Sequence, residues 1–192
     1  GSTLFATLLA AFEILMGRLA GQNEVVVGIP AAGQSLIEDD RALVGHCVNL
    51  LPLRLRQSGT ESFAAALGTT RGAILDAYDH QGVSFGTLLP ELQLTRQDDR
   101  PPLVSVVFNI DVRDDDIHHT GLTVGYDTLV RQAETFELFI NIVDNGSALV
   151  LEASYRTGLY SEDQIRGYLA SYEALLRSAC EAPEGSLDQL TI

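Results

Sequence analysis

The chain has 192 residues, 46% of them hydrophobic, which is enough apolar material for one substantial core and excludes an intrinsically disordered segment. Twelve basic residues against 26 acidic ones give a net charge of −14, and a surface of that sign repels nucleic acids and anionic membranes. Cys47 and Cys180 belong to no CxxC or histidine-rich spacing. This favours a reduced, cytoplasmic protein over a disulfide or zinc framework.

The apolar stretch from Leu4 to Leu19 predicts a helix buried on most sides, because apolar residues recur in it at spacings of three and four. It contains Glu13 and Arg18 and is shorter than the roughly 20 apolar residues that cross a bilayer, so a membrane span is not expected. We expect the helix to end at Gly21.

Two strands are predicted next. Glu24 to Ile29 contains three consecutive valines, which suits an interior strand that Gly28, Pro30 and Gly33 then break. An exposed loop follows, and Val44 to Arg56 is an apolar run that predicts a second, buried strand carrying polar groups.

His46 and Asn49 are the polar groups of interest in that second strand. Residues three apart on a strand point to opposite faces, so at most one of the two side chains can point into a given cavity. A buried asparagine is costly unless it is hydrogen-bonded, which makes Asn49 either a brace for the backbone or a ligand contact.

Helix-capping signals mark the middle of the chain. Ser58 and Glu61 form a capping-box signature for a helix that reaches about Tyr78, and Ser84 is suited to cap a short helix over Phe85 to Leu92. A strand is predicted from Leu103 to Ile110. The long polar arm from Asp111 to Glu134 has only Leu122 to Tyr126 in a strand-like pattern, and we expect the arm to contact another part of the protein.

The last third predicts a hairpin and a helix. Apolar residues occupy every second position in Phe136 to Ile142 and in Leu149 to Tyr155, and Asp144-Asn145-Gly146 supplies the turn between them. Ser161 and Gln164 form a capping box for a long amphipathic helix. We divide the chain into one domain over residues 3–182 and the start of an interdomain linker over 183–192.

Most candidate catalytic groups have a simpler structural interpretation. His118-His119 lies in the polar arm with no acid at catalytic spacing, which favours a solvated loop over a general base. His80 follows a predicted helix end, where histidine commonly contacts terminal carbonyls, and Ser84 is better explained as a cap than as a nucleophile. The sequence contains no phosphate loop, metal-ligand spacing, dinucleotide glycine pattern or known Ser/His/Asp order.

Four segments in a fixed order nevertheless resemble the C-terminal half of a condensation domain of nonribosomal peptide synthetases, in the chloramphenicol acetyltransferase-like superfamily. They cover nearly the whole chain: Val26 to Gln34 (V-V-G-x-P-x-x-G-R, with Gln34 replacing Arg), Val44 to Leu50 (I/V-G-x-F-V-N-T), His80 to Phe85 (H-Q-D-x-P-F) and Arg96 to Leu103 (R-D-x-S-R-x-P-L), continuing into Phe108-Asn109. Gly45 to Pro52 is also similar to condensation domains of hybrid polyketide and peptide assembly lines.

The resemblance implies an α/β lobe with a central mixed β-sheet flanked by helices. In the family two such lobes form a V, and an H-H-x-x-x-D-G motif in the N-terminal lobe supplies the histidine that positions or deprotonates the attacking amine. This sequence lacks that motif, since His118-His119 is followed by Thr123 where the motif needs Asp. No catalytic residue and no directly bound cofactor or metal is therefore expected, and the acyl donor would arrive on the phosphopantetheine arm of a carrier protein.

The resemblance also gives roles to particular residues. Gly28 to Asp40 would form a floor loop, and the arm would cross to the other lobe. Gly82 and Ser84 depart from the family's Asp and Pro. The expected tunnel-lining residues are Gly28, Gly33, Gly45, His46 and Asn49, and the expected motif or structural residues are His80, Gln81, Phe85, Arg100 and Asn109.

The expected function is half of an enzyme that joins an acyl or peptidyl thioester on a carrier protein to an amine, or less favourably to a hydroxyl. The implied partners are the N-terminal lobe of the same domain and acyl or peptidyl carrier proteins. Alone, the lobe should be inactive. Two alternatives stay open: a small acyltransferase that completes its site between protomers with His46 or His80 as base, and a non-catalytic carrier-docking or scaffold module.

Overall fold

The computed structural model describes residues 1–33, 45–94, 100–113, 120–122, 125, 129 and 131–192. These residues form a five-stranded mixed sheet with the strand order β2-β1-β3-β4-β5. The elements in chain order are α1 (Leu4–Ala20), β1 (Glu24–Ala32), β2 (Val48–Arg56), α2 (Phe63–Asp79), α3 (Phe85–Glu91), β3 (Val106–Val112), β4 (Leu138–Asp144), β5 (Leu149–Tyr155), α4 (Glu162–Glu181) and the short 3-10 helix η3 (Leu187–Gln189).

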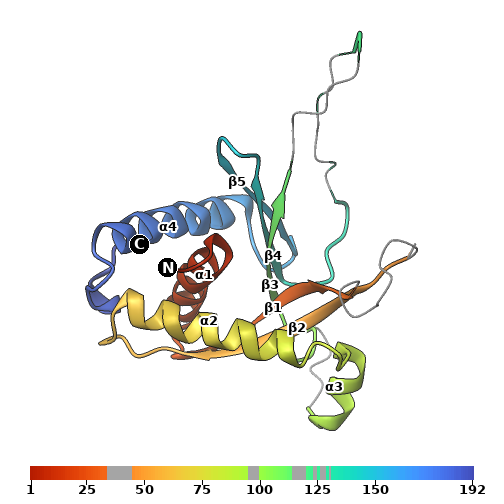
Figure 1. The fold of residues 1–192 in the computed structure, drawn as a ribbon, viewed down its shortest axis with the longest axis horizontal. Coiled ribbons are helices and arrows are strands. Elements are labelled where there is room, and N and C mark those ends of the chain that lie inside the picture. The colour runs from red at the N-terminus through yellow and green to blue at the C-terminus, as the bar shows by residue number, and fades with distance from the viewer. Residues whose placement is uncertain (34–44, 95–99, 114–119, 123–124, 126–128, 130) are drawn as a thin grey trace.

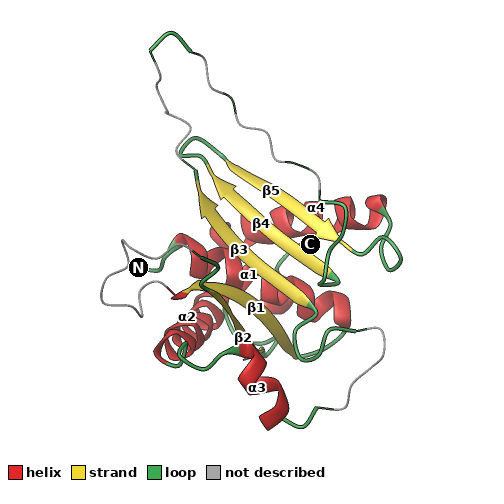
Figure 2. Cartoon of the chain, turned by 90° about the vertical axis from the view of Figure 1, so that its right-hand side faces the viewer, coloured by secondary structure: helices red, strands yellow, loops and turns green. Residues whose placement is uncertain are grey.

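The sheet is mixed, as expected for an α/β lobe. β1 and β3, and β3 and β4, pair in parallel, whereas the outer strands β2 and β5 pair antiparallel with their neighbours. α1, α2 and α4 lie on one side of the sheet (Figure 1). In Figure 2 the strands lie in front of these helices, so the opposite face of the sheet is uncovered by any of the three. We call this the open face.

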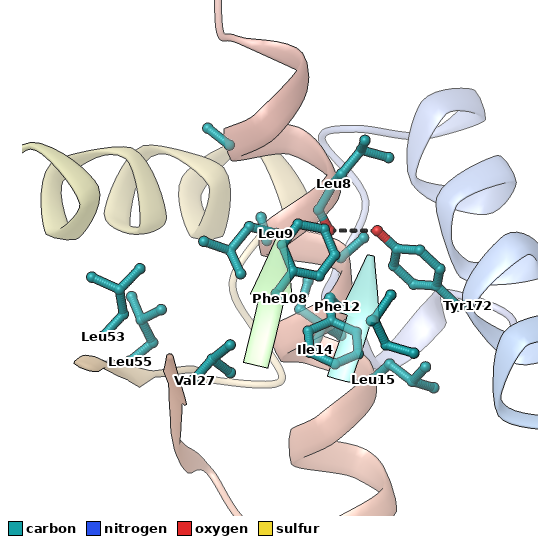
Figure 3. Packing of buried hydrophobic residues seen from close by; sticks show 14 of the residues in the cluster. Leu8, Leu9, Phe12, Ile14, Leu15, Val27, Leu53, Leu55, Phe108 and Tyr172 are labelled. Atoms are coloured by element: carbon teal, nitrogen blue, oxygen red, sulfur yellow. Dashed lines mark hydrogen bonds between the residues drawn. The ribbon is translucent and has the colours of Figure 1, made fainter. Parts of the chain in front are cut away.

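The core lies between the sheet and α1, as the apolar pattern of the first helix predicts. Leu8 to Leu15 are all at most 4% exposed. The Phe12 ring packs 5.1 Å from the Phe108 ring of β3 and edge-on to Tyr172 of α4, whose hydroxyl donates a 2.8 Å hydrogen bond to the Leu8 carbonyl (Figure 3). Gly21 ends α1 in the left-handed conformation, with φ of 63°.

Two strand boundaries differ from the prediction. β1 continues to Ala32, so Gly28 and Pro30 lie inside the strand instead of breaking it. A side chain at residue 28 would meet Val104 Cγ1 at 2.6 Å, which explains the glycine as a close-packing position. β2 begins at Val48 and not at Val44, because its last pair with β1 is Ala32 with Val48.

The third predicted strand is shifted by a few residues, since β3 is Val106–Val112. Leu103 has a positive φ of 65° and cannot belong to it. The predicted arm therefore begins beyond Val112, and the strand-like segment 122–126 falls mostly outside the described residues.

The helices α2, α3 and α4 begin after serine caps, and for α2 the capping serine differs from the prediction. Ser84 and Ser161 cap α3 and α4, the latter in a full capping box with Gln164. The cap of α2 is Ser62, not Ser58, because Ser62 Oγ accepts from the Ala65 amide at 3.2 Å. Ser58 instead donates its own amide to Glu61 Oε1, closing a turn before the helix.

The segment predicted to start a linker lies against the domain. Leu187 and Leu190 are 3% and 5% exposed, and the Arg18 guanidinium donates to both of their carbonyls. Ser186 forms a bridge with Ser62 at the start of α2. The linker boundary at 183 itself stays a prediction. Among the described helices, none combines the length and apolar character that a bilayer crossing requires.

Candidate functional site

A row of polar side chains crosses the open face of the sheet. Phe108 points to the helices, so its neighbour Asn109 in β3 points to the open face. Asn109 lies opposite Asn141 of β4, and Asn141 lies opposite Glu152 of β5. Asn109 Nδ2 donates to Asn141 Oδ1 and to Asp111 Oδ1, both at 3.0 Å, and Asn141 Nδ2 donates to Glu152 Oε2 at 3.1 Å. We call these four residues the polar row.

The row adjoins a hollow of about 960 Å³. Its lining includes Asn141 and Glu152 of the row, residues from the ends of β4 and β5, and residues 129 and 131–134 at the base of the arm. The Arg131 guanidinium lies 5.0 Å from the centre of the Phe139 ring and pairs with Glu134 at 3.4 Å. These contacts fix the base of the arm against the open face.

The charges around the hollow balance. Arg100, Arg131 and Arg156 line it together with Glu134, Glu137 and Glu152. Arg100 Nε lies 3.0 Å from Glu137 Oε1, and this glutamate is only 5% exposed, so the arginine compensates a buried carboxylate. The hollow therefore offers polar contacts without a strong preference for a net charge.

Asn49 acts as a brace. Its Nδ2 donates to the carbonyls of Gln81 and Val83 at 3.0 and 2.9 Å, and its Oδ1 accepts from the Phe85 and Leu50 amides at 3.0 Å. Both amide hydrogens and both carbonyl lone pairs are thus used within the protein. Of the two interpretations open from the sequence, the structure supports the brace.

The other expected tunnel residues lie near the junction of β1 and β2. Gly28 lies within β1, and the Gly33 amide donates to the Cys47 carbonyl at 2.6 Å. Gly45 and His46 are exposed and precede β2, so the argument that His46 and Asn49 occupy opposite faces of one strand is wrong. Residues 34–44 of the expected floor loop lie outside the described residues, and a tunnel-lining role stays a prediction.

The expected motif residues are dispersed between two places. His80, Gln81 and Phe85 lie around the Asn49 brace, and His80 Nδ1 is 2.8 Å from the Asp76 carbonyl at the end of α2, a structural position. Arg100 instead lines the hollow, and Asn109 belongs to the polar row. His118-His119 falls outside the described residues. Within the described ranges no group of three His, Cys, Asp or Glu side chains could hold a metal ion.

The sequence reasoning did not find Asn141, Glu152, Arg131 and Phe139. Asn141 and Phe139 alternate along their strand with the apolar residues that predict its buried face. From the sequence alone, residues at such positions are expected to face solvent. The available signal was an asparagine and a glutamate at middle positions of two predicted strands of one hairpin. Their link to Asn109 depends on the parallel pairing of β3 with β4, which has no local sequence signal.

Comparison with known proteins agrees with this architecture. The chain is 29% identical over 192 residues to a plipastatin synthase protein of Bacillus subtilis and 31% identical over 193 residues to tyrocidine synthase 3 of Brevibacillus parabrevis. Each alignment covers the whole chain but only 5% and 3% of those long proteins.

Solved structures show the same fold. The condensation domain from the monacolin K polyketide synthase MokA has a TM-score of 0.80 at 23% identity, and a four-domain nonribosomal peptide synthetase bound to AMP and glycine has 0.87 at 21%. The alignments cover 95% and 98% of this chain, and 42% and 16% of the respective solved chains. The family described as "Condensation domain" matches residues 1–192. The chain therefore belongs to the condensation domain family.

Proposed function

We propose that this chain is the C-terminal lobe of a condensation domain, which forms an amide between a carrier-bound acyl or peptidyl thioester and an amine in nonribosomal peptide or hybrid polyketide and peptide biosynthesis. The lobe supplies a tunnel wall, a floor loop and an arm that crosses to the N-terminal lobe. It does not supply the H-H-x-x-x-D-G motif.

One observation carries the proposal: α1, α2 and α4 cover one face of the sheet, and the other face holds an ordered polar row and a hollow. A sheet face with fixed polar side chains is suited to be one wall of a site whose second wall comes from another unit. The family match over the whole chain and the 42% coverage of a solved condensation domain support the same interpretation.

The two lobes would have different roles in amide formation. The amine nitrogen attacks the thioester carbonyl, the C–N bond forms, the C–S bond breaks, and the carrier's phosphopantetheine leaves as a thiol while the amine gives up a proton. A histidine of the other lobe would position or deprotonate the amine. The residues of this chain would bind and orient the substrates and exclude water, as positioning groups do.

The proposed partners are the N-terminal lobe and acyl or peptidyl carrier proteins. With a net charge of −14, the lobe cannot attract an acidic carrier by its overall field, so a docking patch has to be local or apolar.

Two neighbouring residues of β5 test whether the open face meets a second lobe. Val150 points to the open face and Leu149 to the helix side, and they are 44% and 39% exposed. With the N-terminal half of a condensation domain added, we expect Val150→Glu to weaken the complex about tenfold, because it places a charge in a contact. Leu149→Glu should change the affinity by less than twofold.

Sedimentation or titration calorimetry with the two purified halves measures this difference. If no complex forms with the unsubstituted chain, or if both variants weaken it equally, the open face is not the interface.

A further inference from the structure

The amide groups of the polar row have only one possible orientation. Glu152 Oε2 accepts from Asn141, and an ionised carboxylate can only accept, so the group facing it must be Asn141 Nδ2. Asn141 Oδ1 must then face Asn109, which must present its own Nδ2. The acceptor at one end of the row thus determines how both amides lie.

The other end of the row imposes the same orientation. Asp111 Oδ1 lies 3.0 Å from Asn109 Nδ2, and this carboxylate also only accepts. Both Nδ2 hydrogens of Asn109 are therefore used. Its Oδ1 has no hydrogen-bond donor among the described residues, and the side chain is half-buried on the open face. The row leaves one oriented carbonyl oxygen to accept a hydrogen bond.

The surroundings favour a neutral donor. The hollow that begins at Asn141, one strand away from Asn109, is lined by three arginines and three glutamates, so its charge selects neither an anion nor a cation. Asp111, the carboxylate in contact with Asn109, is exposed, so solvent and salt screen its charge. An N–H group of a secondary amide is neutral and donates one hydrogen bond.

From this arrangement we propose that Asn109 Oδ1 binds the N–H of a secondary amide in a ligand that extends from the hollow past Asn141 to Asn109, and that Asn141 is a positioning residue for this contact. This proposal rests on the proposed function only for the identity of the natural ligand. The substrates, the products and the carrier arms of amide-forming assembly lines all contain secondary amides. Asn109 is the contact, and Glu152 and Asp111 determine its orientation.

Three matched probes test the contact on the chain itself. N-Pentylbutanamide has an N–H, its N-methyl derivative lacks one, and pentyl butanoate replaces the nitrogen by oxygen. We expect the side-chain amide resonances of Asn109 and Asn141 to shift on titration with the secondary amide in an NMR experiment. The two probes without N–H should bind at least about fivefold more weakly, the factor expected for one net hydrogen bond.

Substitutions in the polar row test whether its residues cause the preference for the secondary amide. Asn109→Ala should weaken the secondary amide about fivefold and leave the other two probes unchanged. Val112→Ala, at an exposed position of β3 that belongs neither to the row nor to the lining of the hollow, is the control and should change the affinity by less than twofold. Asn141→Ala should weaken binding two- to threefold. It should also bring the two Nδ2 proton resonances of Asn109 closer together, because one proton loses its acceptor, an effect that a purely structural role would not produce.

Equal binding of the three probes, no binding of any of them, or unchanged binding in a folded Asn109→Ala variant would overturn the proposal. The assay contains no second lobe and no carrier protein. A failure of amide binding is therefore distinct from a failure of the lobe assignment, which is tested by complex formation and turnover.

Discussion

Replacing Glu13 by glutamine is expected to raise the free energy of unfolding at pH 8 and to remove a large part of its pH dependence. Glu13 lies in the middle of α1, is 0% exposed, and accepts a 2.9 Å hydrogen bond from the Thr70 hydroxyl of α2 at Oε2. Its other oxygen has no hydrogen-bond partner among the described residues. Burial, only partly offset by the Thr70 hydroxyl, raises the pKa of the Glu13 carboxyl to about 8.

The sign follows from comparing the folded and unfolded chains. The unfolded carboxyl has a pKa of 4.5, so below that pH both states are protonated and the contribution to stability is complete. Between pH 4.5 and about 8 unfolding releases a proton, and the free energy of unfolding falls by about 1.4 kcal/mol per pH unit. Above about pH 8 the folded carboxyl also ionises, and the contribution is lost.

Thermal or urea unfolding at several pH values checks this expectation. Glutamine keeps the carbonyl that accepts from Thr70 and cannot ionise, so the difference between Glu13→Gln and the unsubstituted chain should grow by about 3 kcal/mol between pH 5 and pH 8. Glu173→Gln, an exposed member of an ion pair with Arg177, is the control and should leave the curve nearly unchanged. A pH-independent difference for Glu13→Gln would show that the carboxyl is charged in the folded protein.

Replacing Asn49 by alanine is expected to destabilise the chain by about 2 kcal/mol and to loosen the segment from Gln81 to α3. The substitution leaves the Gln81 and Val83 carbonyls and the Phe85 amide without their partner. Since these groups are only partly buried, water replaces some of the lost hydrogen bonds, which limits the cost.

Hydrogen exchange and chemical unfolding together measure this effect. Amides of residues 83–91 should exchange faster in Asn49→Ala, whereas those of β4 should keep their protection. Val48→Ala, at an exposed neighbouring position, is the control. If Asn49→Ala unfolds like the unsubstituted chain, the brace does not stabilise this region, and a ligand contact becomes the better interpretation.

Local signals in the sequence determined most of the fold. The core helix, the hairpin and the caps at Ser84 and Ser161 follow from periodicity and from hydrogen bonds between residues three apart. The errors arose where a non-local contact decided the outcome. β2 starts at Val48 because β1 ends opposite it, and the cap of α2 is Ser62, which itself forms the bridge with Ser186.

The candidate site was less accessible to such reasoning. The sequence predicts Asn49 as a brace or a contact because the residue interrupts an apolar run, and the family resemblance indicates Asn109. Asn141 and Glu152 join Asn109 only after three strands are placed in register, so no local pattern indicates them. In the sequence Glu13 speaks only against a membrane span, because its complete burial depends on the packing of α1 against α2 and the rest of the core.

Turnover tests the central claim most directly. Carrier proteins loaded with an acyl donor and an amine acceptor are incubated with this chain, with an N-terminal half of a condensation domain, and with both, and amide product is measured by mass spectrometry. We predict product only when both halves are present, and its loss when the second histidine of the H-H-x-x-x-D-G motif in the added half is replaced by alanine. Amide formation by this chain alone would contradict the account.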